Sequence, residues 1–137
     1  MTGLVVCVVV LAVASGYGVL HRRRSGRVRV RGRDGGKHLG AAELGEGLGQ
    51  RATLVQFSSA FCAPCRATRR VLTEVAGLVP GVTHVEIDAE DRLELVRALD
   101  IIKTPTVLVL DAEGRIVRRA TGQPRKADVI AALGEAV

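Results

Sequence analysis

The sequence has few cysteines and few aromatic residues for its length. Its 137 residues include three cysteines, two phenylalanines, one tyrosine and no tryptophan. Three cysteines cannot form a disulfide scaffold, so the cysteine content gives no argument for secretion. There is also no second pair of cysteines, and His38 and His84 lack the spacing of metal ligands. A structural zinc site is therefore not expected.

Charge is absent from residues 3–20. At the usual helical rise, these residues span about 27 Å, close to the hydrocarbon thickness of a bilayer. We therefore predict that residues 1–20 form one transmembrane anchor. Cys7 lies inside this anchor and is expected to act there as a small hydrophobic side chain.

Positive charge is concentrated directly after the apolar segment. Residues 21–37 contain eight Lys or Arg residues and one acid, whereas residues 38–137 contain twelve basic and thirteen acidic residues. The net charge of +6 therefore comes from a short segment and not from the folded part. Because this segment has no aromatic residue for base stacking, nucleic-acid binding is not expected. We interpret residues 21–37 as a basic juxtamembrane linker. The membrane contacts would be residues 3–20 and the basic residues within 22–37.

The arginines also predict the topology. The positive-inside rule places them in the cytoplasm, together with the domain that follows, in a single-pass protein of the cell membrane. The alternative is a cleaved signal peptide, since Ala12-Val13-Ala14 resembles a cleavage site of small residues. Met1-Thr2 carries no basic side chain, however, and the arginine cluster would oppose export.

Residues 38–137 are expected to form one α/β domain without internal repeats. A weak short helix around Leu39–Leu48 precedes the first confident strand. Apolar periodicity then predicts strands at 52–57, 82–88, 105–110 and 115–121, and helices at 63–79, 91–99 and 127–137. This order favours a mixed sheet covered by helices on both faces.

The motif Cys62-Ala63-Pro64-Cys65 stands where the first predicted strand turns into a predicted helix. Two thiols at this spacing can close a disulfide within one helical turn, and the helix N-terminus favours the thiolate form of Cys62. The four residues alone would also suit half of a zinc site. Strand, Cys-x-x-Cys and helix together indicate a thiol–disulfide redox site.

Over about residues 41–136 the chain resembles the thioredoxin family. The matching features are Phe61-Cys62-Ala63-Pro64-Cys65 after the strand, Val85-Glu86-Ile87-Asp88, Thr104-Pro105-Thr106 before an apolar strand, an acid/Gly hairpin and Gly122. This resemblance implies a thioredoxin-like fold for residues 38–137, with a central mixed β-sheet flanked by helices.

The resemblance also implies roles for individual residues. Cys62 would be the attacking thiol and Cys65 the resolving thiol. Pro105 matches the family's cis-proline beside the cysteine pair, and Thr104 would present its backbone to an extended substrate peptide. Phe61 stands where the family usually has tryptophan and is expected at the rim of the substrate site.

Two positions depart from the family's pattern. Gln56 aligns with the family's buried acid under the resolving cysteine, and His84 aligns with the lysine near that acid. Proton transfer would then need another route, for which His84 and Gln56 are weak candidates. The alternative is that His84 is a plain strand residue and Gln56 a hydrogen-bonded buried amide. Losing both charges together leaves neither one buried without its partner.

Together these features predict a membrane-tethered protein-disulfide reductase of the thioredoxin type, using the Cys62–Cys65 dithiol without cofactor or metal. Its partners would be disulfide-containing proteins and an external reductant such as a thioredoxin reductase. We expect a monomer. Two alternatives stay open: an outward-facing oxidoreductase for exported proteins or cytochrome maturation, and a non-catalytic adaptor with the thioredoxin fold.

Overall fold

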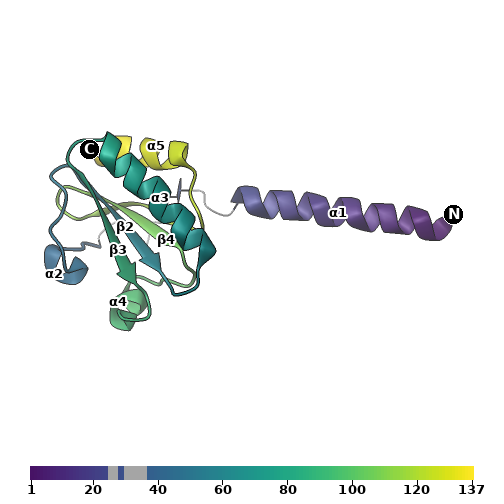
Figure 1. Ribbon diagram of the computed structural model, residues 1–137, viewed down its shortest axis with the longest axis horizontal. Coiled ribbons are helices and arrows are strands. Elements are labelled where there is room, and N and C mark those ends of the chain that lie inside the picture. Colours follow the sequence, from purple (N-terminus) through teal and green to yellow (C-terminus); the bar gives the residue numbers. More distant parts are fainter. Residues whose placement is uncertain (25–27, 30–36) are drawn as a thin grey trace.

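The computed structural model describes residues 1–24, 28–29 and 37–137. A long N-terminal helix, α1 (Thr2–Arg24), projects from an α/β domain (Figure 1). The domain contains β1 (Val28–Arg29), α2 (Ala41–Leu44), β2 (Ala52–Ser58), α3 (Ala63–Leu78), β3 (Val82–Asp88), α4 (Leu93–Ala98), β4 (Thr106–Asp111), β5 (Ile116–Thr121) and α5 (Lys126–Ala136). Apart from β1, this is the order of elements expected from the sequence.

The described strands form one mixed sheet in the order β1-β5-β4-β2-β3. β2 and β3 run parallel, whereas the other neighbours are antiparallel. Phe57 near the end of β2 lies opposite Thr106 at the start of β4, which in turn lies opposite Thr121 at the end of β5. These three residues mark one end of the sheet, which we call the Phe57 end.

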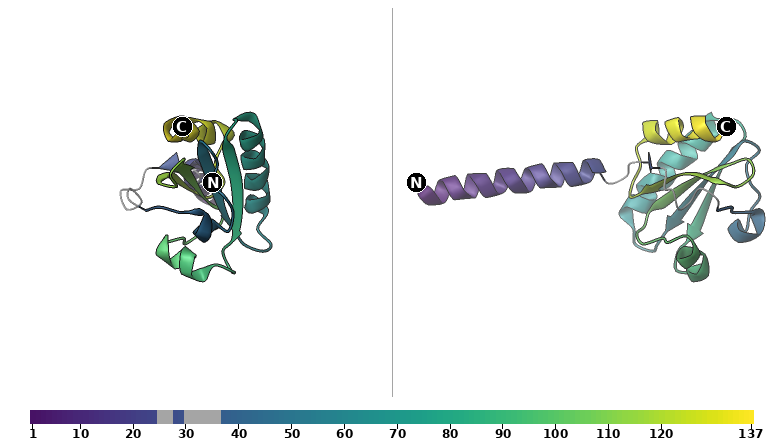
Figure 2. Two further views of the ribbon diagram at one scale, coloured as in Figure 1. Left: turned by 90° about the vertical axis from the view of Figure 1, so that its left-hand side faces the viewer. Right: turned by 180° about the vertical axis from the view of Figure 1, so that it is seen from behind.

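Helices cover both faces of the sheet, with α3 and α5 on one face and α2 and α4 on the other (Figures 1 and 2). Because side chains alternate along a strand, Leu54 of β2 packs in the cluster that contains Leu72 of α3. Val55 packs in the opposite cluster with Leu44 of α2. All residues of β2 are buried, as expected for a central strand covered on both faces. The same alternation directs Gln56 towards α3.

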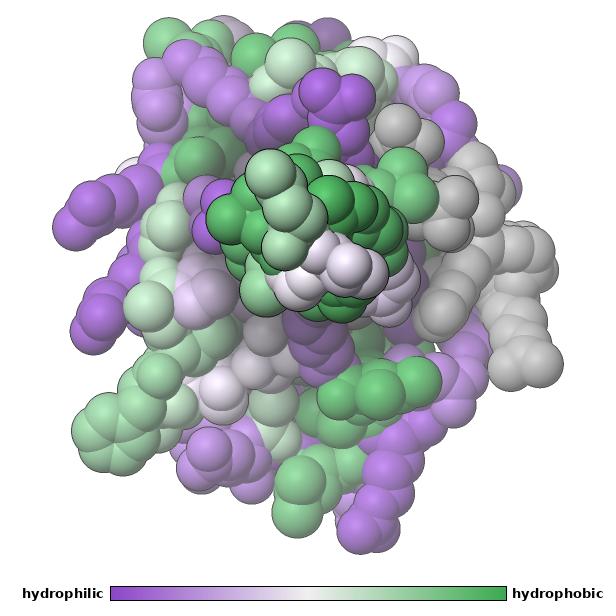
Figure 3. Space-filling view, turned by 90° about the vertical axis from the view of Figure 1, so that its right-hand side faces the viewer, coloured by the Kyte–Doolittle hydropathy of each residue, from purple (hydrophilic) through white to green (hydrophobic). Residues whose placement is uncertain are grey.

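The side chains of α1 are exposed as far as they are described. Thr2–Arg23 is the single candidate membrane span in the described part of the chain, and a signal sequence could share its length and composition. Seen along its axis, the helix presents a mainly apolar surface (Figure 3). The helix extends past the expected boundary at residue 20.

The segment at 21–37, predicted to be a basic juxtamembrane linker, is described only in part. It contains the last turn of α1 and also β1, whose Val28 pairs with Ala120 of β5. A strand of two residues has no periodicity from which it could be predicted. The remaining basic residues of this segment, Arg27, Arg31 and Arg33, lie outside the described residues.

The packing of α3 on the sheet gives a first test. Leu72 is fully buried, so Leu72→Ala should lower the free energy of unfolding by about 2–5 kcal/mol. Leu78 lies on the same helix and is 61% exposed, so Leu78→Ala should change it by less than about 0.5 kcal/mol. Urea denaturation followed by circular dichroism measures both. Equal losses in the two variants would contradict the placement of α3.

Candidate active site

The chain turns from β2 into α3 through Cys62, which is the N-cap residue of the helix. The Cys62 Sγ accepts a hydrogen bond of 3.2 Å from the backbone N–H of Cys65. The sulfur thereby satisfies one of the N–H groups that the first turn of a helix leaves without a partner. Pro64 is accommodated in this turn because its missing N–H is not needed there. A thiolate at Cys62 would be stabilised by this N–H and by the helix dipole.

Cys62 and Cys65 form a disulfide, with the sulfurs 2.20 Å and the Cα atoms 5.2 Å apart. Cys62 is half-buried, whereas Cys65 is only 2% exposed. A client could therefore reach the sulfur of Cys62 more easily than that of Cys65. This difference suits the predicted roles of attacking and resolving thiol.

The loop that ends at Pro105 lies beside the turn into α3. The Thr104–Pro105 peptide bond is cis, the isomer implied by the resemblance. The hydroxyls of Ser59 and Thr104 are hydrogen-bonded at 2.8 Å, which joins the two loops directly. The Pro105 carbonyl accepts a 2.8 Å hydrogen bond from the Gly122 N–H, which follows β5. The cysteine turn and the proline loop therefore meet at the Phe57 end of the sheet.

Phe61 has an unusual backbone and an unusual environment. Its side chain is fully exposed, and its φ of 58° lies in the left-handed region that aromatic residues rarely adopt. Backbone strain of this kind concentrates at functional sites. An exposed aromatic ring next to Cys62 suits the predicted position at the rim of a substrate site.

Gln56 connects the sheet to the first turn of α3. Its Nε2 donates hydrogen bonds of 2.8 Å to the backbone carbonyl of Cys65 and 2.9 Å to Ser58 Oγ. Its Oε1 accepts a 3.2 Å hydrogen bond from Nε2 of His84. The His84 Nδ1 lies 3.4 Å from Thr73 Oγ1. With Nε2 as donor to Gln56, Nδ1 of the neutral ring accepts from Thr73, so the network defines one tautomer.

Burial lowers the pKa of His84 below its ordinary value. Among the nearby charges, Glu86 and Glu46 raise that pKa, whereas Arg69 lowers it. Arg69 and Glu86 also bind each other through two hydrogen bonds of 2.6 Å. The positive charge of Arg69 thus partly cancels the effect of Glu86 on the imidazole, and the neutral ring is favoured.

The structure therefore brings Gln56 and His84 together. The amide of Gln56 hydrogen-bonds the backbone oxygen of Cys65, and an amide carries no titratable proton near neutral pH. The contributions of Ser58 and Thr73 were missed by sequence reasoning. The spacing of Gln56 and Ser58 along one strand face was the one signal that could have indicated their contact.

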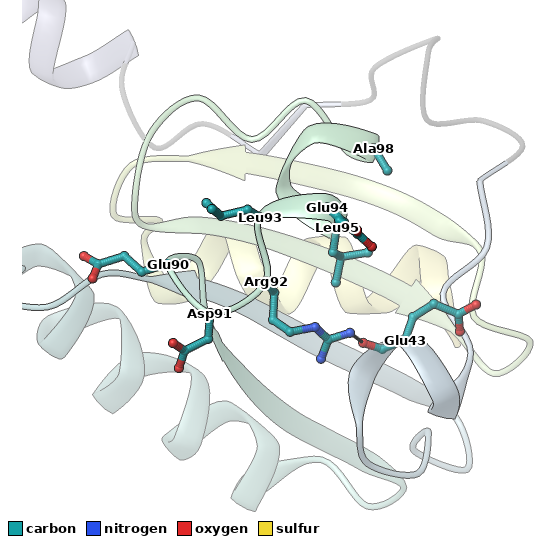
Figure 4. Close-up of a pocket in the computed structure, with 8 residues that line it drawn as sticks. All are labelled: Glu43, Glu90, Asp91, Arg92, Leu93, Glu94, Leu95 and Ala98. Atoms are coloured by element: carbon teal, nitrogen blue, oxygen red, sulfur yellow. Dashed lines mark hydrogen bonds between the residues drawn. The ribbon is translucent and has the colours of Figure 1, made fainter.

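A surface pocket of about 590 Å³ lies apart from both cysteines. It is formed by residues preceding and within α4 together with Glu43 of α2, and Arg92 donates to the backbone carbonyl of Glu43 (Figure 4). Within residues 1–24, 28–29 and 37–137, no cluster of three or more His, Cys, Asp or Glu residues is placed to hold a metal ion.

Known proteins share this fold. The profile of the Thioredoxin family matches residues 41–135. The chain belongs to the thioredoxin family. Thioredoxin from Mycobacterium tuberculosis (strain ATCC 25618 / H37Rv) is 30% identical over 88 residues, covering 64% of this chain and 75% of the relative. A bifunctional thioredoxin reductase/thioredoxin from Mycobacterium leprae is 27% identical over 88 residues, or 64% of this chain and 19% of that protein.

Solved structures agree with this assignment. Chloroplastic thioredoxin z is 25% identical with a TM-score of 0.57, covering 64% of this chain and 79% of that structure. A thioredoxin mutant from Halobacterium salinarum has a TM-score of 0.58 at 18% identity, covering 64% and 75%, which supports the fold alone. The predicted fold and the predicted enzyme class, a thiol–disulfide oxidoreductase, are confirmed.

The half-buried imidazole of His84 predicts a pH dependence of stability. Because the folded-state pKa of His84 lies below the unfolded value of 6.5, the folded protein binds fewer protons than the unfolded chain between these values. The free energy of unfolding should be highest above pH 6.5 and should fall as the pH drops through the folded-state pKa. In His84→Gln this contribution is absent, while an amide N–H remains available to Gln56.

Urea denaturation of both proteins from pH 8 to pH 5 tests this dependence. The stability of the wild type relative to His84→Gln should decrease towards acid. A difference that stays constant over this range would show that the His84 pKa is the same in both states.

Proposed function

We propose that this thioredoxin-family protein is a membrane-tethered protein-disulfide reductase in which Cys62 is the nucleophile and Cys65 the resolving thiol. The observation that carries the proposal is the placement of the pair. Cys62 caps α3 and is accessible, Cys65 is buried one turn deeper, and the cis Thr104–Pro105 bond lies alongside. Phe61 and the backbone of Thr104 would form the edges of the site for an extended client peptide.

The reaction begins from the reduced pair. The Cys62 thiolate attacks one sulfur of a client disulfide, forms a mixed disulfide and expels the first client thiolate. That thiolate can take the proton of the Cys65 thiol. The Cys65 thiolate then attacks the Cys62 sulfur, which re-forms the Cys62–Cys65 bond and releases the second client thiolate. Two electrons pass to the client, and an external dithiol returns two electrons to the enzyme.

This sequence of steps needs no carboxylate beneath Cys65. Gln56 holds the first turn of α3 through the Cys65 carbonyl, and His84 holds the amide of Gln56 in the matching orientation. We assign both residues to positioning. The expelled client thiolate is the conjugate base of a cysteine thiol, whose reference pKa is about 8.5, so it is a competent base for the second step.

The external reductant belongs, in this proposal, to the thioredoxin reductase class. The name of the Mycobacterium leprae relative joins a thioredoxin reductase and a thioredoxin in one chain, which makes such a pairing reasonable for this protein as well. Residues 1–20 would anchor the chain, residues 21–37 would lie near the headgroups, and residues 38–137 would work in the cytoplasm.

Replacement of single cysteines tests the assigned roles. In an insulin-reduction assay with dithiothreitol, Cys62→Ser should fall to the rate of dithiothreitol alone, because no attacking thiolate remains. Cys65→Ser should also lose turnover but should accumulate a covalent adduct with a disulfide client, since nothing resolves it. Cys7→Ser is the control, as Cys7 is free and lies in α1.

Full activity of Cys62→Ser would overturn the mechanism. Non-covalent client binding by Cys65→Ser without any adduct would favour the adaptor alternative.

The topology is tested with C-terminal reporter fusions. A phosphatase that is active only outside the cytoplasm should stay inactive when fused after Val137, while a reporter active in the cytoplasm should give signal. The opposite pattern would assign the protein to exported clients.

A further inference from the structure

The pairing of β1 with the sheet limits the distance between the end of α1 and the domain. Arg24 ends α1 and Val28 begins β1, so the chain between their Cα atoms spans at most about 14 Å. β1 belongs to the sheet, since Val28 pairs with Ala120 and Arg29 with Arg119 of β5. If α1 crosses a bilayer, its final basic turn lies in the headgroup layer, and the edge of the sheet lies close above it.

The register of β1 also defines which end of the sheet is nearest to α1. Arg29 lies opposite Arg119 of β5, and the preceding residue Val28 lies opposite Ala120. The N-terminal end of β1 therefore points towards Thr121. Thr121 lies at the Phe57 end, opposite Thr106 and next to the proline loop. The chain therefore enters the sheet at the end that carries the disulfide. In Figure 1, the first turn of α3 accordingly lies on the side from which α1 projects.

The surface at this end carries exposed apolar and basic side chains beside the cysteine turn, and the exposed acids Asp88, Glu90 and Asp91 where β3 ends. Phe61 is fully exposed, and Ile102 of the proline loop is 88% exposed. Arg66, in the first turns of α3, and Lys103, next to Ile102, are also exposed. Figure 3 views this side of the molecule, where green apolar patches lie among purple hydrophilic side chains. Aromatic and aliphatic groups flanked by cations are the side chains that suit an anionic membrane interface.

We propose that the Phe57 end of the domain rests on the anionic headgroup layer, with Phe61 and Ile102 entering the interface and Arg66 and Lys103 facing the headgroups. The substrates of the Cys62–Cys65 pair are then disulfides at the membrane surface, in proteins embedded in the bilayer or lying on it. This inference rests on the membrane tether of the proposed function and adds an orientation to it. The tether keeps the dithiol at high local concentration for such substrates.

Tryptophan fluorescence of the full chain in vesicles tests the orientation. The chain has no tryptophan, so Phe61→Trp provides a single reporter, and Leu78→Trp provides a matched reporter at the other end of α3. Each protein is reconstituted into phosphatidylglycerol/phosphatidylcholine vesicles with and without brominated acyl chains. Quenching of the reporter at position 61 should exceed that at position 78 by at least about twofold, with a blue-shifted emission.

A second substitution identifies the groups responsible. In the Phe61→Trp background, Ile102→Glu should abolish the excess quenching, because a carboxylate opposes entry into an anionic interface. Leu78→Glu in the same background should leave it intact. Flotation of the vesicles is measured in parallel. The orientation is overturned if the protein floats with the vesicles but the reporter at position 61 is quenched no more than the reporter at 78. The membrane tether is still supported by that result. A chain that does not float overturns the tether itself and the orientation with it.

Discussion

The hydrogen bond from the buried amide of Gln56 to the carbonyl of Cys65 ties the centre of the sheet to the first turn of α3. The positions of the other site residues depend on that turn. Cys62 can cap the helix only if the turn begins there, and Cys65 is buried because the same turn is held against β2. The Gln56 amide lies in a fully buried environment in which a lost partner would cost about 1–3 kcal/mol, so the turn has little freedom to move.

The hydrogen-bonded pair of Gln56 and His84 is neutral when the imidazole is unprotonated, so the site does not depend on a buried ion pair. A buried carboxylate would need a compensating cation, and removing either partner alone would leave an unpaired charge in the core. Gln56 and His84 avoid this problem, because both are neutral when the half-buried imidazole is unprotonated and the two side chains are hydrogen-bonded to each other. Protonation of His84 at low pH is expected to disturb this hydrogen-bonded pair. In the proposed mechanism, the chemistry of the dithiol relies on the helix N-terminus at Cys62 and on the thiolates exchanged in the reaction.

Much of this could be predicted from the sequence, because the strongest signals were local. The buried strand before Cys62 and the helix after it follow from apolar periodicity, and the order of elements follows from both. Contacts between distant segments could not be derived in this way. The Ser59–Thr104 bond joins two loops, and the hydrogen bond of Gln56 to His84 depends on the parallel register of β2 and β3. α4 covers Leu93–Ala98, whereas a helix over residues 91–99 was expected, because Arg92 and Leu99 are its cap residues.

The two residues of β1 show how a weak local element can have a large geometric consequence. As a free linker, residues 21–37 would let the domain turn in any direction relative to a membrane. Once Val28 and Arg29 pair with β5, the direction of approach is set by the antiparallel register, and that register points from the domain towards the end carrying Pro105 and Cys62. If α1 is a membrane anchor, as proposed, the anchor and the active site share one end of the sheet, and substrates at the bilayer surface are reached more readily than substrates away from it. In the proposed orientation, the exposure of Phe61 has a physical reason, since an aromatic ring that is costly in water is favourable at a membrane interface.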